Sequence, residues 1–323
     1  MKVIIWDSAG ARLSPLTDLR ASFDVRTGAL TTFERMRLEF ERAGTGEITG
    51  LIVPPPIRAI TAARHPDLAV NDVSRALGGE KLALVVDGSC PVAALPELRL
   101  GDIEPLGAIF DTGGSFVAGV MVDEVIDSLK VESWISETSE GGRRLSVPRL
   151  TRPWDVVRHR DECLARDLEL LSDGSEPLGA TAPPAGATII ESERLMLARD
   201  ASIGSGVVLD ATRGAIAIAS GATIGHHAII EGPVAIGRDS VITARAHVKA
   251  NTVIGPVCKV GGEVGGTIFQ GYANKSHEGH LGDSWVGEWV NLGANTNNSN
   301  LLNTYGEVKA SAVPAVAEAS CLG

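Results

Sequence analysis

The stretch IASGATIGHHAIIEGPVAIGRDSVITARAHVKANTVIGPVCKV, residues 218–260, repeats a simple pattern every six residues. An aliphatic residue opens each repeat, at Ile218, Ile224, Ile230, Ile236, Ile242, Val248, Ile254 and Val260. Four positions further on, each repeat has a small or β-branched residue, at Ala222, Ala228, Val234, Ser240, Ala246, Thr252, Cys258 and Val264. A fixed short period of this kind indicates stacked repeats rather than an ordinary globular core.

The six-residue period predicts a left-handed parallel β-helix with three short strands in each coil. Its aliphatic residues fill the interior, and its coils stack about 4.8 Å apart like parallel strands. Outside the stretch, aliphatic residues are again spaced by multiples of six at Leu197, Ile203 and Leu209, and at Ile268, Val286 and Leu292. A three-residue slip near 212–214 separates the early members from the rest. Polar Asn274 and His280 occupy later phase positions, so we expect a loop to leave the wall there.

Length and charge narrow the class of protein. The chain has 323 residues, which suits two domains, and its cores must be aliphatic because aromatic residues make up only 4%. A formal net charge of −11 argues against an extended nucleic-acid surface.

Apolar runs and cysteines indicate the compartment in which the protein resides. No apolar run approaches the roughly 18 residues of a membrane span, and MKVIIWDSAG at the start is typical of a first strand rather than a signal peptide. The four cysteines form no CxxC pair and indicate reduced thiols: Cys90, Cys163, Cys258 and Cys321. We therefore expect a cytoplasmic protein.

The first half of the chain has the pattern of an α/β domain. Apolar runs at 3–6, 50–55 and 82–88 end in turn residues, as buried parallel strands do. Segments 31–44 and 152–171 have the spacing of amphipathic helices. The predicted division is an α/β domain over 1–171, a Gly- and Pro-rich linker over 172–187, a β-helix over 188–309 and an irregular tail over 310–323.

The loop after the first strand has the composition of an anion site. Gly10 allows backbone amides to approach a phosphate, and Arg12, Arg20 and Arg26 add positive charge to an acidic protein. An ordinary βα loop with exposed arginines explains the same residues.

Three segments carry a family resemblance: GARLSPLT (10–17), PLTDLRASFDVRTGALTTFER (15–35) and KSHEGHLGDSWVGEWVNLGANTNNSNL (275–301). With the repeat, the chain resembles the bifunctional N-acetylglucosamine-1-phosphate uridylyltransferase and glucosamine-1-phosphate N-acetyltransferase family, in a divergent variant. The resemblance implies UTP, a sugar phosphate and acetyl-CoA as substrates. It also implies a homotrimer of β-helices.

In the acetyltransferase half, the resemblance implies that His277 is the general base, since it lies four residues before Leu281-Gly282-Asp283. A neutral imidazole suits removal of a proton from a sugar amine. The same resemblance makes His280 a substrate-lining residue and Asn291 and Asn300 sugar or acetyl contacts. Lys275 would offset the sugar phosphate.

In the nucleotidyltransferase half, the resemblance implies a catalytic role for Arg12 and phosphate contacts at Gly10. Asp87 would hold Mg²⁺ against the phosphates of UTP. The signature is altered, since the usual G-x-G-T-R is here SAGAR and no lysine follows the PLT element. Arg20 or Arg26 would then replace that lysine.

Several residues also fit purely structural roles. Asn295, Asn297 and Asn298 fit an asparagine ladder, Trp285 and Trp289 fit packing at a subunit contact, and Cys258 fits the interior of the repeat.

Two other functions are open. The altered first signature, together with a tail that lacks the six-residue phase, fits a catalytically degenerate sugar-nucleotide-binding or scaffold protein. A zinc hydratase on the same β-helix would need three histidines, and His247, His277 and His280 match the spacing of that class poorly.

Overall fold

The computed structural model describes residues 1–91, 107–127, 131–139, 141–172, 186–299, 303–304, 306, 309–313 and 316–319. The chain forms two compact units. The sheet unit contains Met1–Val25 and Thr31–Asp155, and the β-helix unit contains Arg26–Leu30 and Val156–Gly323. The structure thus divides the chain at Asp155, earlier than the boundary at 171 that the sequence suggested. Residues 173–185 of the predicted linker lie outside the described residues.

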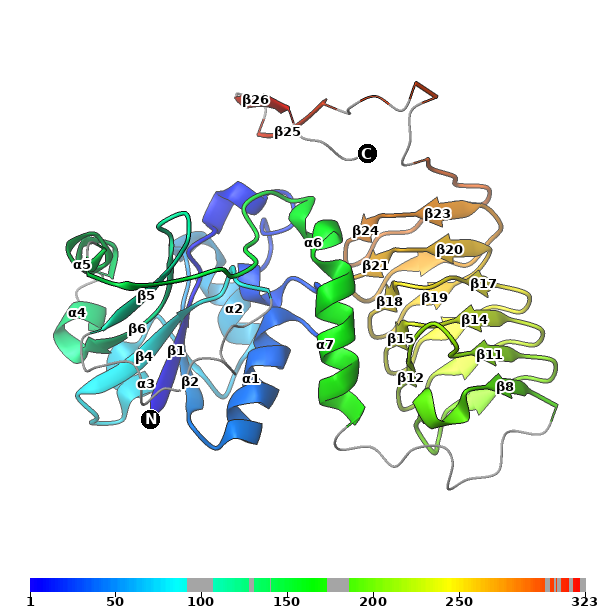
Figure 1. Cartoon of the computed structure of the whole chain (residues 1–323), viewed down its shortest axis with the longest axis horizontal. Coiled ribbons are helices and arrows are strands. Elements are labelled where there is room, and N and C mark those ends of the chain that lie inside the picture. The colour runs from blue at the N-terminus through cyan, green and yellow to red at the C-terminus, as the bar shows by residue number, and fades with distance from the viewer. Residues whose placement is uncertain are drawn as a thin grey trace. The chain divides into compact units, whose positions relative to one another are not determined.

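The sheet unit is built on a mixed sheet of seven strands in the order β3-β2-β1-β4-β6-β5-β7 (Figure 1). Its strands are β1 Lys2–Trp6, β2 Glu47–Ile52, β3 Ala69–Val70, β4 Leu82–Asp87, β5 Ala108–Asp111, β6 Phe116–Val122 and β7 Arg143–Leu145. Strand β1 is parallel to both β2 and β4, whereas β6 is antiparallel to β4 and β5. Strands β1, β4 and β5 therefore end at the same edge of the sheet.

Helices cover both faces of this sheet, which explains why its strands are continuously apolar. They are α1 Thr32–Ala43, α2 Arg58–Arg64, α3 Val73–Leu77, α4 Asp123–Asp127 and α5 Val131–Thr138. Val3 and Ile5 of β1 pack with Phe33 and Met36 of α1, while Ile4 packs on the other face with Val73 of α3.

Helix α1 begins and ends as its sequence predicts. Thr31 and Glu34 form a capping box at its start, and Gly44 ends it in the left-handed conformation with φ 62°. The predicted helix at 152–171 is instead two helices, α6 Asp155–Arg158 and α7 Arg160–Ser172.

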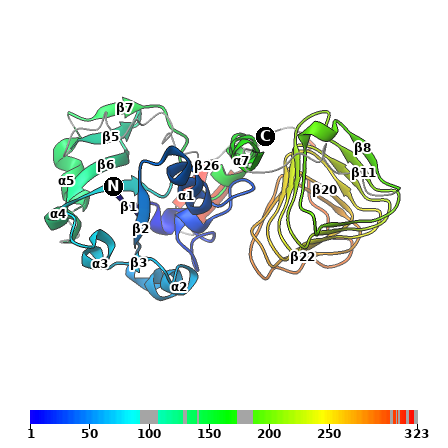
Figure 2. The ribbon, with the colours of Figure 1, turned by 90° about the horizontal axis from the view of Figure 1, so that it is seen from below.

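The β-helix unit consists of three parallel sheets whose coils lie one over another (Figure 2). The first contains β8 Thr188–Ile190, β11 Val208–Asp210, β14 Ile229–Glu231, β17 His247–Val248, β20 Glu263–Gly265 and β23 His280–Gly282. The second contains β9 Leu195–Leu197, β12 Ile216–Ile218, β15 Val234–Ile236, β18 Thr252–Ile254, β21 Ile268–Phe269 and β24 Trp285–Val286. The third contains β10 Ser202–Ile203, β13 Thr223–Ile224, β16 Val241–Ile242, β19 Lys259–Val260 and β22 Asn274–Lys275.

The register confirms the six-residue period. Ile218 pairs with Ile236, and Ile236 pairs with Ile254, so each full coil takes 18 residues. Leu197 pairs with Ile218 across 21 residues, which confirms the three-residue slip. The aliphatic and small positions of the repeat form one buried cluster that includes Cys258. The predicted fold class, an α/β unit followed by a left-handed β-helix, is confirmed.

The predicted phase is wrong at Ile268, whereas Val286 belongs to the interior cluster and Leu292 packs against it, as predicted. Ile254 pairs with Phe269 and Val260 with Lys275, each across 15 residues, because this coil is three residues shorter than the others. Phe269 and Leu281 therefore join the interior cluster, and Ile268 does not. The expected loop over 274–280 is also wrong, since Asn274–Lys275 forms β22 and His280–Gly282 forms β23.

Two segments from earlier in the chain pack on the outside of the β-helix. Leu164 and Leu168 of α7 form a small core with Ala235, Val253 and Ile268. Segment Arg26–Leu30 is anchored by hydrogen bonds, which include Leu30 N–H to Asp167 Oδ2 at 2.9 Å and Trp285 Nε1–H to the Arg26 carbonyl at 3.1 Å. Trp285 therefore has a structural partner within its own unit.

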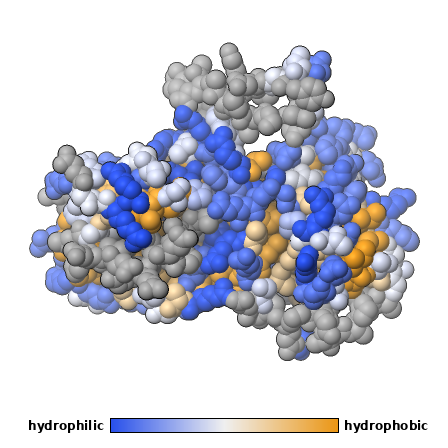
Figure 3. Space-filling view, viewed as in Figure 1, coloured by the Kyte–Doolittle hydropathy of each residue, from blue (hydrophilic) through white to orange (hydrophobic). Residues whose placement is uncertain are grey.

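The remaining surface of the described residues is mixed in character. Apolar side chains reach the face of the β-helix unit seen in Figure 3. Among the apolar residues of this unit, Ile190 and Ile229 are 38% and 39% exposed. In the tail, β25 Lys309–Val313 and β26 Val316–Ala319 pair antiparallel, so the prediction of an irregular tail is wrong there. None of the described helices has the length and apolar character needed to cross a membrane.

Candidate functional site

The edge of the sheet where β1, β4 and β5 end collects three aspartates. Asp7 follows β1, Asp87 ends β4 and Asp111 ends β5. Open α/β sheets bind ligands at this edge, because the loops beyond the strand ends form a crevice there. Burial raises the pKa of Asp7 despite hydrogen bonds to its carboxylate from the Ser22 and Gly10 amides.

Asp87 and Asp111 share one cation, Arg149. The Arg149 Nη1 donates to Asp87 Oδ2 and to Ser89 Oγ, the latter at 2.9 Å, and Nε donates to Asp111 Oδ2 at 2.9 Å. Nη2 donates to the Phe116 carbonyl. The second oxygen of Asp87 accepts from Ser8 Oγ at 2.6 Å and from the Ser89 amide at 2.8 Å.

The predicted anion loop follows β1 as a short 3₁₀ turn, Gly10–Leu13. Gly10 has φ 48°, in the left-handed region that favours glycine. Arg12 is exposed and lies over its own loop, with Nη2 2.8 Å from the Ser8 carbonyl and Nε 3.3 Å from the Ala9 carbonyl. Gly10 and Arg12 therefore meet at the sheet edge, as predicted.

The other two arginines are placed differently. Arg20 is buried and donates to the Leu16 carbonyl at 3.3 Å. Arg26 belongs to the β-helix unit, where its backbone amide and Nε both donate to Gln270. That placement does not fit the phosphate contact predicted for Arg26, because its guanidinium instead holds the segment Arg26–Leu30 on the coil.

The Mg²⁺ expected at Asp87 requires several oxygen ligands. In the part of the chain that the structure describes, no three His, Cys, Asp or Glu side chains come together to hold a metal ion. One oxygen of Asp87 faces the guanidinium of Arg149, and the other already accepts two hydrogen bonds. These residues do not fit a Mg²⁺ site in this arrangement. The histidines His247 and His280 pair instead with Glu231 and Glu263, which gives no support to the zinc hydratase alternative.

At the far end of the β-helix, His277 lies in the turn between β22 and β23, and its side chain is exposed. Lys275 is 1% exposed and points inward. Its ammonium donates to the carbonyls of Gly261, His277 and Gly279 at 3.0, 3.0 and 2.9 Å. Since an ammonium has three donors, Lys275 does not fit the predicted phosphate contact. Burial lowers its pKa, and its role is to hold the turn that carries His277.

The asparagines of this end are mainly structural. Asn298 accepts from the Gly282 amide at 2.8 Å and donates to the Gly282 carbonyl at 2.8 Å, as a neighbouring strand would. Asn297 accepts from the His280 amide at 2.6 Å. Asn291 accepts from the Asn274 amide group, which leaves its own amide nitrogen for a ligand. Asn300, predicted to contact the sugar, lies outside the described residues.

Sequence reasoning missed Arg149, Asp111 and Ser89, which organise the sheet edge, and it considered Ser8 only as a small residue of the anion loop. Arg149 stands in the segment VPRLT, 147–151, which has no recognisable motif. Asp111 follows an apolar run, as Asp87 does, and that shared pattern was the one usable signal.

Comparison with known proteins now identifies the family. The family model described as "Sugar nucleotidyl transferase" matches residues 3–176. The chain belongs to this family. The "Bifunctional protein GlmU" of Acaryochloris marina (strain MBIC 11017) is 28% identical over an alignment of 136 residues that covers 36% of this chain and 30% of that protein. The chain spans about a third of the length of the curated relative that it matches.

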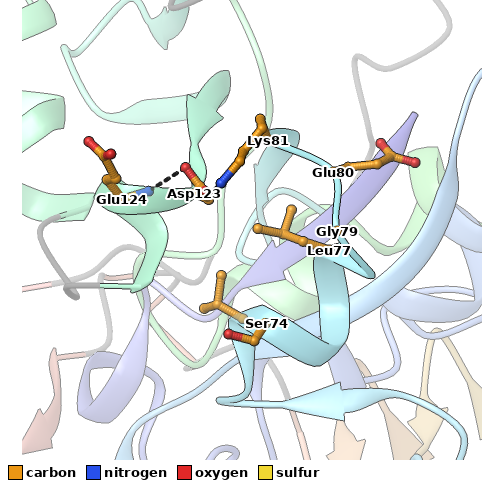
Figure 4. Close-up of a pocket in the computed structure, with 8 residues that line it drawn as sticks. Ser74, Leu77, Gly79, Glu80, Lys81, Asp123 and Glu124 are labelled. Carbon is orange, nitrogen blue, oxygen red and sulfur yellow. Dashed lines mark hydrogen bonds and ion pairs between the residues drawn. The ribbon is translucent and has the colours of Figure 1, made fainter.

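Two further hollows of this family member carry no evident chemistry. One, of about 300 Å³, lies at the opposite edge of the sheet, where Lys81 and Asp123 form an exposed ion pair at 2.6 Å (Figure 4). The other, of about 660 Å³, lies on the β-helix unit between Leu171 of α7, Leu30 and the largely apolar strands β9, β12 and β15.

Proposed function

We propose that this protein acts in amino-sugar nucleotide synthesis and that each unit performs one reaction. The sheet unit would transfer UMP from UTP to N-acetylglucosamine 1-phosphate. The β-helix unit would transfer acetyl from acetyl-CoA to glucosamine 1-phosphate. The observation that carries the proposal is that the family match spans the sheet unit, in which Gly10 and Arg12 meet at the edge where such sheets bind ligands. The trimer and the cytoplasmic location stay predictions.

In the sheet unit, the sugar phosphate oxygen attacks the α-phosphorus of UTP, and pyrophosphate leaves. The backbone amides of the turn Gly10–Leu13 and the exposed guanidinium of Arg12 are suited to hold phosphate oxygens. The Ser8 and Ala9 carbonyls hold Arg12 over the loop, so that its charge stays close to those amides. No step is assigned to a metal, because Arg149 is bound to Asp87.

In the β-helix unit, the amine nitrogen of the sugar bonds to the thioester carbonyl carbon, the carbon–sulfur bond breaks, and CoA leaves as its thiol. His277 would take the proton that the amine loses, which is the part of a general base. Its side chain is exposed, while its own carbonyl is held by the buried ammonium of Lys275. That hydrogen bond supports the turn from which the imidazole projects.

The first test is thiol release from acetyl-CoA on addition of glucosamine 1-phosphate. We expect His277→Ala to lower the rate by about 10²- to 10⁴-fold. The control is His247→Ala, a half-exposed histidine of the β-helix that is paired with Glu231 and lies outside the motif; this variant should keep the wild-type rate. If folded wild-type protein releases no thiol in response to the sugar, the acetyl-transfer proposal is wrong.

The second candidate is a binding protein that does not catalyse uridylyl transfer, and the pairing of Asp87 with Arg149 favours it. Pyrophosphate release from UTP and N-acetylglucosamine 1-phosphate separates the two. Release that falls in Arg12→Ala supports the transferase. Binding of UDP-N-acetylglucosamine without any pyrophosphate release supports the binding protein.

A further inference from the structure

Two buried carboxylates at the carboxyl edge of the sheet are held by one cation. The Asp87 and Asp111 side chains are 1% and 12% exposed, and that of Arg149 is 8% exposed. Each carboxylate gives one oxygen to the guanidinium. The other oxygen of Asp111 accepts from the Ser115 amide at 2.8 Å, so all four oxygens have a donor.

The guanidinium is well suited to this bridge. A planar fork can bond to two carboxylates in different directions, which the point charge of a lysine does less well. Of its five N–H groups, Arg149 uses one on Asp111, two on Asp87 and Ser89, and one on the Phe116 carbonyl. Few N–H groups of Arg149 remain to bind a phosphate, so its charge neutralises the two carboxylates.

We propose that Arg149 occupies the place of a divalent cation at this sheet edge. Asp87 and Asp111 are then neutralised and positioned by a covalently attached cation, and the sheet unit holds no divalent metal there. This inference depends only on the contacts of Arg149 and holds whichever of the two proposed functions is correct. It replaces the expectation of a Mg²⁺ at Asp87.

The test begins with wild-type protein stripped of metal. Titration with Mn²⁺, followed by electron paramagnetic resonance and by thermal melting, should reveal no site that depends on Asp87 and no shift on addition of EDTA. A stoichiometric Mn²⁺ site in the wild type that disappears in Asp87→Asn would overturn the proposal. This measurement decides the matter even if the variants of Arg149 do not fold.

The second part removes the built-in cation. Arg149→Ala leaves two buried carboxylates without their cation and leaves space, so we expect a melting temperature lower by roughly 5–15 °C that millimolar Mn²⁺ partly restores. Arg149→Met should show the same fall and less recovery, because its side chain fills the space. In Arg149→Ala combined with Asp87→Asn, the recovery should vanish.

The matched control is Arg144→Ala. Arg144 lies near the same strand end and donates to the Asp111 backbone carbonyl at 3.4 Å rather than to a carboxylate. Its removal should not make the melting temperature depend on Mn²⁺. A folded Arg149→Ala variant that is indifferent to Mn²⁺, or an Arg144→Ala variant that responds equally, would contradict the equivalence of Arg149 and a metal ion.

Discussion

The sheet unit and the β-helix unit each bury a cationic side chain, and they surround it in different ways. Arg149 contacts two carboxylates that lie 38 and 62 residues away along the chain. Lys275 contacts three backbone carbonyls, and two of them belong to the turn that follows it directly. A long-range ion pair fixes how distant strands meet, whereas a cage of carbonyls fixes the local path of one turn.

The difference has an electrostatic consequence. The charge of Arg149 is matched by carboxylates, so the desolvation of the three groups is offset by their attraction. Lys275 bonds only to backbone dipoles, and burial lowers its pKa although the charge of Glu278 acts in the opposite direction. The two sites therefore differ in what should happen when the cation is removed or loses its proton.

The largest expected effect in this comparison is that of Lys275→Met. This change keeps the length of the side chain and removes the ammonium from three carbonyls, of which only that of Gly279 keeps a second donor, the Glu263 amide. It should lower the free energy of unfolding by about 3 kcal/mol. Urea denaturation measures it. Lys259→Met is the control, since Lys259 is exposed on the adjacent strand β19. Equal stability of the two variants would show that the carbonyl cage contributes little.

A smaller effect is expected at the last coil, where side chains replace a neighbouring strand. Asn298→Ala removes hydrogen bonds to both backbone groups of Gly282 and to Ser284 Oγ. We expect a loss of about 1–2 kcal/mol, and faster amide hydrogen exchange at Gly282. Asn303→Ala, at an exposed position, should match the wild type. Unchanged exchange at Gly282 would mean that the backbone alone maintains this edge.

The smallest effect concerns pH. The folded pKa of Lys275 is lower than its ordinary value of 10.5. Between those two values the unfolded chain binds more protons than the folded chain, so stability should rise with pH in that interval. The free energy of unfolding of the wild type relative to Lys275→Met should therefore increase as pH approaches 10.5. A difference that stays constant or decreases would reverse the sign assigned to this pKa shift.

The sequence predicts the fold well where the signal is local and periodic. The aliphatic positions Ile218 to Val260 determine the coil length and the interior directly. The short coil could not be predicted from the period, because Ile268 and Phe269 are adjacent and both apolar. The spacing alone does not show which of the two side chains points into the interior. With Ile268 as the interior position, the next one six residues on is Asn274, so the prediction did not place Lys275 in the interior.

The site was only partly predictable. Gly10 and Arg12 lie together in one short loop, and their proximity follows from the sequence. The partners of Asp87 depend on tertiary contacts between segments that share no period or motif, so Arg149 gave no signal. Glycine and arginine near a strand end predict where a ligand is expected to bind, and they do not predict which cation neutralises the neighbouring carboxylates.

Because segment Arg26–Leu30 belongs to the β-helix unit, a single cut in the chain cannot separate the two units. The chain passes between the units at three peptide bonds, Val25–Arg26, Leu30–Thr31 and Asp155–Val156. The Gly- and Pro-rich region after α7 is therefore not the boundary between the two units. Cleavage there would leave the β-helix attached through non-covalent contacts, among them the packing of Leu164 and Leu168, the bonds of residues 26–30 and those of Arg160 to Gly266 and Asp283. A β-helix produced alone, from residue 186 onward, would present Ala235, Val253 and Ile268 to water.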